Sequence, residues 1–262
     1  VKKLLFRVRE YLWYVLKARH RHGFGVHSPF AYDVITKVFE EKSSYYIYND
    51  VEKERRRLLY DRTSIFFDDY GTGKSGERRI CDIARKALKN ASDAQLIFRT
   101  ALFQKPKTVI ELGTSLGLTT AYLSKAAGSG KCHTFDGCGE VVDFAKQVAN
   151  NCGTAASTVF HVGDIAESLP LVIKDMESVD VVFMDANHTK EATLAYYSII
   201  KPKLSNGSVL IVDDIHSSKG MREAWNEIRQ DEKARVSFDM YGLGVIYYNE
   251  KLSRKNYIYY RD

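Results

Sequence analysis

The spacing of apolar and polar positions changes near residue 107 and divides the chain into two regions. After this point, short apolar runs alternate with segments in which apolar residues recur every three or four positions. The runs predict strands at 108–112, 132–136, 158–162, 179–184, 207–212, 235–240 and 243–248. The periodic segments predict helices at 118–127, 140–150, 165–175, 190–201 and 220–230. This alternation indicates an α/β fold with a mostly parallel sheet and helices on both faces.

The last two predicted strands are joined by a loop too short for a crossover helix, so they must pair as an antiparallel hairpin. The prediction is a Rossmann-like sheet of seven strands that ends in this hairpin. The chain before residue 107 is helical and rich in aromatic residues. We therefore expect a helical N-terminal extension over 1–92, an α/β domain over 93–250 and a C-terminal tail over 251–262.

The N-terminal region begins with a predicted amphipathic helix over 2–20. Its apolar face is formed by Leu4, Leu5, Val8, Leu12, Val15 and Leu16, with the basic residues largely on the other face. A basic amphipathic helix can bind a membrane surface or a nucleic acid. Docking of such a helix on its own protein is the more common arrangement, and we expect it here.

Further helices are predicted over 29–41, 50–62, 77–88 and 93–104, the first with Ser28 as N-cap and Pro29 at its first position. Segment 71–76 reads Gly-Thr-Gly-Lys-Ser-Gly, but Asp68 occupies the position where a P-loop requires glycine. We therefore predict a loop there and no Walker motif.

Composition is that of an ordinary globular protein, with 45% hydrophobic and 27% charged residues. Much of the net charge of +6 lies in the first 22 residues, so we do not expect the whole protein to bind nucleic acid. The four cysteines show no Cys-x-x-Cys spacing, and no apolar stretch approaches the roughly 18 residues of a membrane span. These features predict a soluble cytoplasmic protein with reduced thiols and no membrane span.

Candidate ligand-binding residues follow the first three predicted strands. Gly113 and Gly117 lack a Cβ and let the backbone approach a ligand closely. Asp136, at the end of the second strand, can accept hydrogen bonds from the hydroxyls of an adenosine ribose or can cap a turn. Asp164, after the third, can bind an adenine amino group or serve as a helix N-cap, and the two roles are compatible.

Three carboxylates follow the next two strands, Asp185 after the fourth and Asp213 and Asp214 after the fifth. Crowded like charges are costly unless a positive group joins them, and Mg²⁺ prefers oxygen ligands. His188, near Asp185, has an imidazole suited to removing a proton from a substrate hydroxyl. The alternative is that the aspartates cap helices and that His188 only caps or packs.

The segment Glu111-Leu-Gly-Thr-Ser-Leu-Gly117, with Asp136, Asp164, Phe183-Met-Asp185 and Leu210-Ile-Val-Asp-Asp214, resembles the class I S-adenosylmethionine-dependent methyltransferases. The resemblance covers 105–250 and is greatest to the catechol O-methyltransferase-like branch, which shares the two-glycine turn and the closing hairpin. It implies S-adenosylmethionine as cofactor. The implied cofactor contacts are Glu111, Gly113, Thr114, Ser115, Gly117, Asp136, Gly137, Asp164, Ile165 and Asp185.

The resemblance also implies a site for Mg²⁺ or a similar cation at Asp185, Asp213 and Asp214, and catalytic roles for Asp185 and His188. Asp214 departs from the branch, which has asparagine there. The branch's catalytic lysine falls on His188, with Lys190 as a nearby alternative.

We therefore expect transfer of a methyl group from S-adenosylmethionine to an oxygen of a small-molecule acceptor, assisted by Mg²⁺. One alternative is a metal-independent enzyme with His188 as base for an oxygen or nitrogen acceptor. A second is a non-catalytic cofactor-binding module whose basic helix contacts a membrane or RNA. The turn lacks the three-glycine dinucleotide fingerprint, which disfavours an NAD-dependent oxidoreductase. No nucleic-acid partner is expected, and a homodimer stays open.

Overall fold

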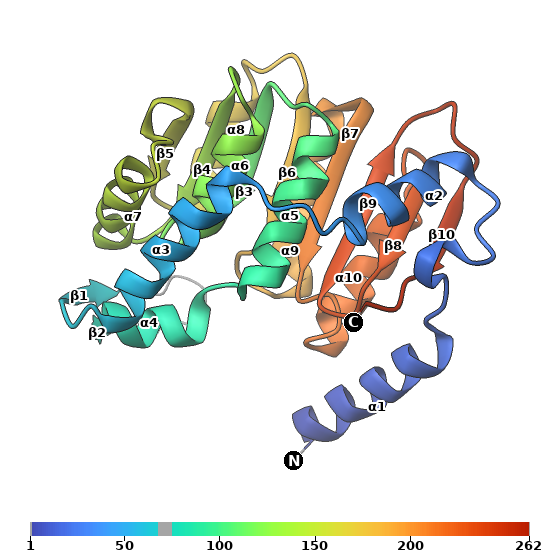
Figure 1. The fold of residues 1–262 in the computed structure, drawn as a ribbon, viewed down its shortest axis with the longest axis horizontal. Coiled ribbons are helices and arrows are strands. Elements are labelled where there is room, and N and C mark those ends of the chain that lie inside the picture. The colour runs from blue at the N-terminus through green and yellow to red at the C-terminus, as the bar shows by residue number, and fades with distance from the viewer. Residues whose placement is uncertain (1, 68–74, 262) are drawn as a thin grey trace. The chain divides into compact units, whose positions relative to one another are not determined.

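The computed structural model describes residues 2–67 and 75–261 (Figure 1). The chain divides into two compact units. Unit 1 comprises Val1–Glu41 and Asp180–Asp262, and unit 2 comprises Lys42–Val179. Unit 2 is therefore inserted, in sequence, between the two segments of unit 1. The predicted domain boundaries at 92 and 250 stay a prediction.

Unit 2 is built on three parallel strands in the order β3-β4-β5. These strands are β3 (Thr108–Leu112), β4 (Lys131–Asp136) and β5 (Thr158–Val162). Its helices are α3 (Tyr46–Tyr60), α4 (Ile80–Ala87), α5 (Ala91–Phe103), α6 (Leu118–Ala126), α7 (Gly139–Asn151) and α8 (Ile165–Ile173), with a short turn η3 (Ala155–Ser157). Val109, Ile110 and Leu123 are fully buried, so the apolar runs that predicted these elements form the core.

Unit 1 contains five strands in the order β10-β8-β9-β7-β6. They are β6 (Val179–Met184), β7 (Leu204–Asp213), β8 (Val236–Asp239), β9 (Leu243–Tyr248) and β10 (Lys255–Ile258). Its helices are α1 (Lys2–Lys17), α2 (Pro29–Val34), α9 (Lys190–Ile200) and α10 (Lys219–Arg229). A π-helical segment, η2 (Ile35–Phe39), continues α2, and η1 (Arg21–Gly23) and η4 (Lys201–Lys203) are short turns. Ser28 accepts a hydrogen bond from the Ala31 amide, which confirms the predicted N-cap of α2.

The predicted antiparallel hairpin is formed by β8 and β9, and β9 also pairs antiparallel with β7. The backbone of β9 lies against α10 at Gly244. A Cβ built there would lie 2.6 Å from the indole ring of Trp225, so only glycine permits this close packing. The fold class is confirmed in its mostly parallel character and in its terminal hairpin.

The main correction to the fold is the number of strands. The two units together supply eight strands besides a separate two-stranded hairpin, in the described residues, whereas seven were predicted. The extra strand, β10, lies in the predicted C-terminal tail and pairs parallel with β8. Within β10 only Tyr257 is buried, and it stacks on Phe238 with 5.3 Å between ring centroids. A single buried position produces no apolar run, so the sequence pattern missed this strand.

A second correction concerns the predicted helix over 77–88. Its first residues belong to β2 (Gly76–Arg79), which pairs antiparallel with β1 (Ser64–Phe67), and the helix α4 begins only at Ile80. Partly buried and exposed residues alternate along β2, which is the periodicity of a strand. Most of the predicted loop over 71–76 lies outside the described residues.

The helix α1 (dark blue in Figure 1) docks on the protein as predicted, but not through its apolar face. Leu12 and Leu16 are 57% and 76% exposed, whereas Glu10 and Tyr14 on the opposite face are buried. The Tyr14 hydroxyl donates a hydrogen bond to the carbonyl of Tyr259, 2.6 Å away. The helix therefore docks through a polar and aromatic face.

None of the helices in the described part of the chain combines the length and the apolar character that crossing a bilayer requires.

Candidate functional site

In unit 2, the candidate ligand-binding residues gather where β3 runs into α6. The amides of Gly113 and Thr114 donate to the carbonyl of Phe135 in β4, at 2.9 and 3.2 Å. Gly113 and Gly117 have φ angles of 99° and 81°, which side chains with a Cβ rarely adopt. A Cβ on Gly117 would also lie 2.9 Å from the Cβ of Ala145 in α7. The predicted glycine turn is present, and Gly117 is required for packing as well as for conformation.

Asp136, at the end of β4, fixes this turn. Its Oδ2 accepts a hydrogen bond from the Ser115 amide at 2.9 Å, and its Oδ1 accepts from the Cys138 amide at 3.0 Å. Ser115 has a φ of 47°, a left-handed conformation that costs free energy for a residue other than glycine. Asp136, which was predicted to bind a ribose, therefore also holds the backbone of the turn in place, as the turn-capping alternative described.

Glu111 and Thr114 lie in a buried polar network. The Oε2 atom of Glu111 accepts hydrogen bonds from Thr120 at 2.5 Å and from Thr134 at 2.7 Å. The hydroxyls of Thr114 and Thr134 lie 2.6 Å apart. These bonds tie β3, β4 and α6 together. A direct contact of Glu111 or Thr114 with a cofactor stays a prediction.

The connection after β5 places the remaining predicted cofactor residues. The Asp164 carboxylate accepts a hydrogen bond from the Ala166 amide at 2.8 Å, so it is the N-cap of α8. Ile165 is buried, and Gly137 is half-buried. The Gly163 amide donates to the carbonyl of Asp136, which joins this connection to the end of β4.

In unit 1, the structure brings together Asp185, His188 and Asp213. Asp185 follows β6, and Asp213 is the last residue of β7 and is almost fully buried. The His188 Nε2 atom lies 3.4 Å from Asp185 Oδ1. One candidate ligand atom from each of these three residues lies within 4.8 Å of the other two. Two of the three predicted carboxylates therefore lie close together, with the imidazole of His188 beside them.

Asp214 does not join this trio. It lies next to the trio, because its carboxylate is 4.0 Å from the Nδ1 atom of His188, and its backbone has a left-handed φ of 55°. The loop that contains His188 is strained as well, because Asn187 and His188 have φ angles of 63° and 30°. Residues in such conformations are often found at functional sites. The strain is thus concentrated around the imidazole.

Lys190, the alternative base, is engaged elsewhere. Its ammonium group forms ion pairs with Glu223 and Glu227 of α10. The hydrogen bond to Glu227, with a further one to Glu223, raises the pKa of Lys190. An ammonium with a raised pKa is a poor general base, so His188 is the better candidate.

The trio in unit 1 has the chemistry of a divalent-cation site. Ligand atoms that share an ion at about 2.1 Å lie about 3 to 4 Å apart, so the observed spacing requires only a small contraction. Two carboxylates and one imidazole form a mixed oxygen and nitrogen set, which suits Mn²⁺, Fe²⁺ or Zn²⁺ better than Mg²⁺. The residues present therefore fit a cation, and the role of Asp214 as a further ligand stays a prediction.

One arrangement was missed by sequence reasoning. His216 is buried between two acids, with Nδ1 3.2 Å from Glu10 Oε2 and Nε2 2.9 Å from Asp239 Oδ2. Glu10 is bound in addition by Arg222 at 2.7 Å. Burial disfavours the imidazolium, but the bonds to Asp239 and Glu10 outweigh it and raise the pKa of His216. The partners are 206 and 23 positions away in sequence, so no local pattern could reveal them.

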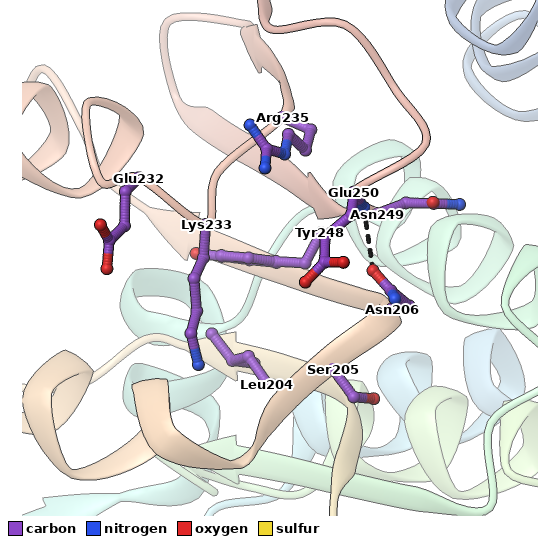
Figure 2. Close-up of a pocket in the computed structure, with 9 residues that line it drawn as sticks. All are labelled: Leu204, Ser205, Asn206, Glu232, Lys233, Arg235, Tyr248, Asn249 and Glu250. Carbon is purple, nitrogen blue, oxygen red and sulfur yellow. Dashed lines mark hydrogen bonds between the residues drawn. The ribbon is translucent and has the colours of Figure 1, made fainter.

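A polar pocket of unit 1 lies at the other end of β7 from Asp213 (Figure 2). It is lined by Leu204, Ser205, Asn206, Glu232, Lys233, Arg235, Tyr248, Asn249 and Glu250. Leu204 begins the strand that Asp213 ends, a separation of about 30 Å at 3.3 Å per residue. This pocket is therefore distinct from the acidic cluster.

Comparison with known proteins defines the class of this fold. Three solved structures are similar over most of the chain. An O-methyltransferase from Bacillus cereus in complex with SAH has a TM-score of 0.56 at 15% identity, over 82% of this chain and 95% of its own. The O-methyltransferase TomG from Streptomyces achromogenes, involved in tomaymycin synthesis and in complex with SAM, has a TM-score of 0.56 at 16% identity, over 84% of this chain and 96% of its own. The SAH-bound methyltransferase PaMTH1 from Podospora anserina has a TM-score of 0.59 at 12% identity, over 85% of this chain and 97% of its own. The fold is the Rossmann-like methyltransferase fold.

Residues 110–215 match the family model described as a methyltransferase domain. The predicted resemblance to the methyltransferases is therefore confirmed for a methyltransferase domain over this stretch, and the similar structures share its fold. A search of the curated proteins gave no match.

Proposed function

We propose that this protein transfers a methyl group from S-adenosylmethionine to an oxygen atom of a small-molecule acceptor. One observation carries the proposal: the stretch that matches the methyltransferase-domain model, 110–215, contains both the glycine turn and the cluster of Asp185, His188 and Asp213. The SAM and SAH in the similar structures support the choice of donor.

In this proposal, unit 2 binds and orients the donor. The bonds from Ser115 and Cys138 to Asp136 hold the turn in one conformation before any ligand arrives. A preformed turn lowers the entropic cost of binding. Asp136 would bind the ribose hydroxyls and Asp164 would lie near the adenine. The sulfonium of the donor makes its methyl group electrophilic, so alignment is the main task left to the protein.

The acceptor side is assigned to unit 1. His188 would accept the proton of the acceptor hydroxyl, and Asp185, 3.4 Å away, would orient the ring and stabilise the imidazolium. A divalent cation held by Asp185 and Asp213 would lower the pKa of that hydroxyl. The Nε2 atom of His188 cannot bind a cation and a proton at once, so the metal-assisted and metal-independent versions differ in the role of this residue.

The second candidate function is the metal-independent one, favoured by the contact between Asp185 and His188. The two are separated by methyl transfer measured with and without EDTA, for the wild type and for Asp213→Asn. Loss of activity when EDTA is added to the wild type, and loss of activity in Asp213→Asn, support the metal-assisted version if Mn²⁺ or Mg²⁺ restores the EDTA-treated wild type. Activity that survives both the addition of EDTA and the Asp213→Asn substitution supports His188 acting alone.

The proposal as a whole is tested by isothermal titration of S-adenosylmethionine together with a methyl-transfer assay on small hydroxylated acceptors. Asp164→Asn retains an N-cap for α8 but changes the group offered to the adenine. Asp164→Ala removes both functions. Weaker donor binding in both variants, with α8 destabilised only in the alanine variant, supports adenine recognition by Asp164. Unchanged binding in the asparagine variant leaves Asp164 as a helix cap and removes it from the proposed site.

A further inference from the structure

The outward face of α1 is apolar and exposed. Leu4, Leu5, Val8, Leu12, Val15 and Leu16 range from 40% to 76% exposed. Their spacing of three and four residues places them on one stripe of the helix. Isolated exposed apolar residues are ordinary, but a continuous stripe along a whole helix marks an interaction surface. We call these six residues the outer stripe.

The helix is held with this stripe outward by its buried face. Glu10 lies between His216 and Arg222, and Tyr14 bonds to the carbonyl of Tyr259. Both side chains are less than 5% exposed. Turning the stripe inward would break this buried ionic network, which is costly. The exposed apolar face is therefore a fixed feature of unit 1.

The segment of sequence that contains the stripe is basic. The chain up to residue 22 carries the basic residues Lys2, Lys3, Arg7, Arg9, Lys17, Arg19 and Arg21 and one acid, Glu10. That acid is buried and compensated by Arg222 and His216, so it offers no negative charge to a partner. A second copy of this helix would bring like charges together. The surface therefore complements an anionic partner.

The loop after α1 adds a second, independent feature. His20 and His22 have φ angles of 68° and 54°, the left-handed region that residues other than glycine rarely adopt. This conformation forms a hollow lined by Ala18, Arg19, His20, Arg21, His22, Phe24 and Tyr260. The Arg21 guanidinium lies 4.4 Å from the centre of the Tyr260 ring, and Phe24 is 84% exposed. Arginines beside exposed aromatic rings suit phosphate headgroups at a lipid interface.

We propose that α1 and the loop 18–24 bind the surface of a membrane that contains anionic lipids, with the outer stripe among the acyl chains and the basic residues at the headgroups. A helix with one apolar face and basic flanks lies in the plane of the interface in this way. The binding needs neither the donor nor an acceptor and is independent of the proposed methyl transfer.

The test is sedimentation of the full chain with vesicles of phosphatidylcholine alone or mixed with phosphatidylglycerol. We expect binding to the mixed vesicles only, weakened by salt. Leu12→Glu with Leu16→Glu should lower the partition coefficient at least about tenfold. Leu171→Glu is the matched control, because Leu171 is 64% exposed on α8 of unit 2, and it should leave binding unchanged. Arg9→Gln and Lys17→Gln should each weaken binding about fivefold.

Tryptophan fluorescence gives a second measurement. The chain has two tryptophans, of which Trp225 is buried and Trp13, in α1, is 38% exposed. Binding should shift the emission of Trp13 to shorter wavelength. Absence of binding to mixed vesicles, or binding that survives the two glutamates, overturns the proposal. Self-association abolished by the glutamates without vesicle binding assigns the stripe to a second copy and also overturns it, as does salt-sensitive binding to RNA alone.

Discussion

Gly117 gives the sharpest test of how the donor turn is built. It is the N-cap of α6, with a φ of 81°, and a Cβ there would lie 2.9 Å from Ala145 Cβ and 3.0 Å from Ala145 Cα. The left-handed conformation costs a residue with a Cβ about 1–2 kcal/mol. Overpacking against α7 adds about 1–3 kcal/mol, because one contact is to backbone that cannot rotate away. Gly117→Ala should therefore lower the free energy of unfolding by about 2–5 kcal/mol.

Gly153→Ala is the matched control. Gly153 has a φ of 66°, but a Cβ there would meet no atom within 4 Å. It should cost only the conformational term, about 1–2 kcal/mol. Urea unfolding followed by circular dichroism measures both variants. Equal destabilisation by the two substitutions would refute the packing argument at the α6–α7 contact. Gly117→Ala should also weaken donor binding, because it displaces the turn next to Ser115, whereas Gly153→Ala should not.

Three further predictions follow from other contacts. His216→Ala leaves the buried carboxylate of Asp239 without its imidazole partner and should cost about 3–5 kcal/mol in urea unfolding; a cost below 1 kcal/mol would contradict the assigned network. Asp164→Ala should cost about 1 kcal/mol through loss of the N-cap of α8, with Asp164→Asn close to the wild type, and equal losses would contradict a capping role. Burial and the nearby charge of Lys131 lower the pKa of His133. Burial and the neighbouring ring of His133 lower the pKa of His161. The fold therefore favours the neutral rings, so stability should fall as pH decreases below the unfolded value of about 6.5, and His161→Gln should reduce this dependence in melting curves recorded across that range.

The α/β region was predictable because its strands are buried as apolar runs. Val109, Ile110 and Leu112 lie in one such run, and all are fully buried. The same runs show where each strand ends, so the turn at Gly113 and the acidic residues after the strands could also be predicted. The structure placed Asp164 as a helix cap, one of the two compatible roles given to it.

The parts that could not be predicted depend on contacts between distant residues. The docking of α1 is decided by Glu10 with His216 and Arg222, and periodicity alone cannot distinguish a face that docks from one that stays exposed. In β10, Tyr257 is the one buried residue, and the strand is otherwise held by its pairing with β8 and by the hydrogen bond from Ser237 to Asn256. His188 was expected as a base, but its approach to Asp185 and Asp213 was not, because it depends on the left-handed backbone at Asn187 and His188.

The proposed binding of S-adenosylmethionine by unit 2 can be measured by isothermal titration of the wild type and Asp136→Ala with S-adenosylmethionine and its demethylated product. The wild type should bind both, and NAD should not compete. Removal of the carboxylate should weaken binding about 10- to 100-fold, through loss of charge-assisted hydrogen bonds. Absence of binding to the wild type, or equal binding by Asp136→Ala, would contradict the account.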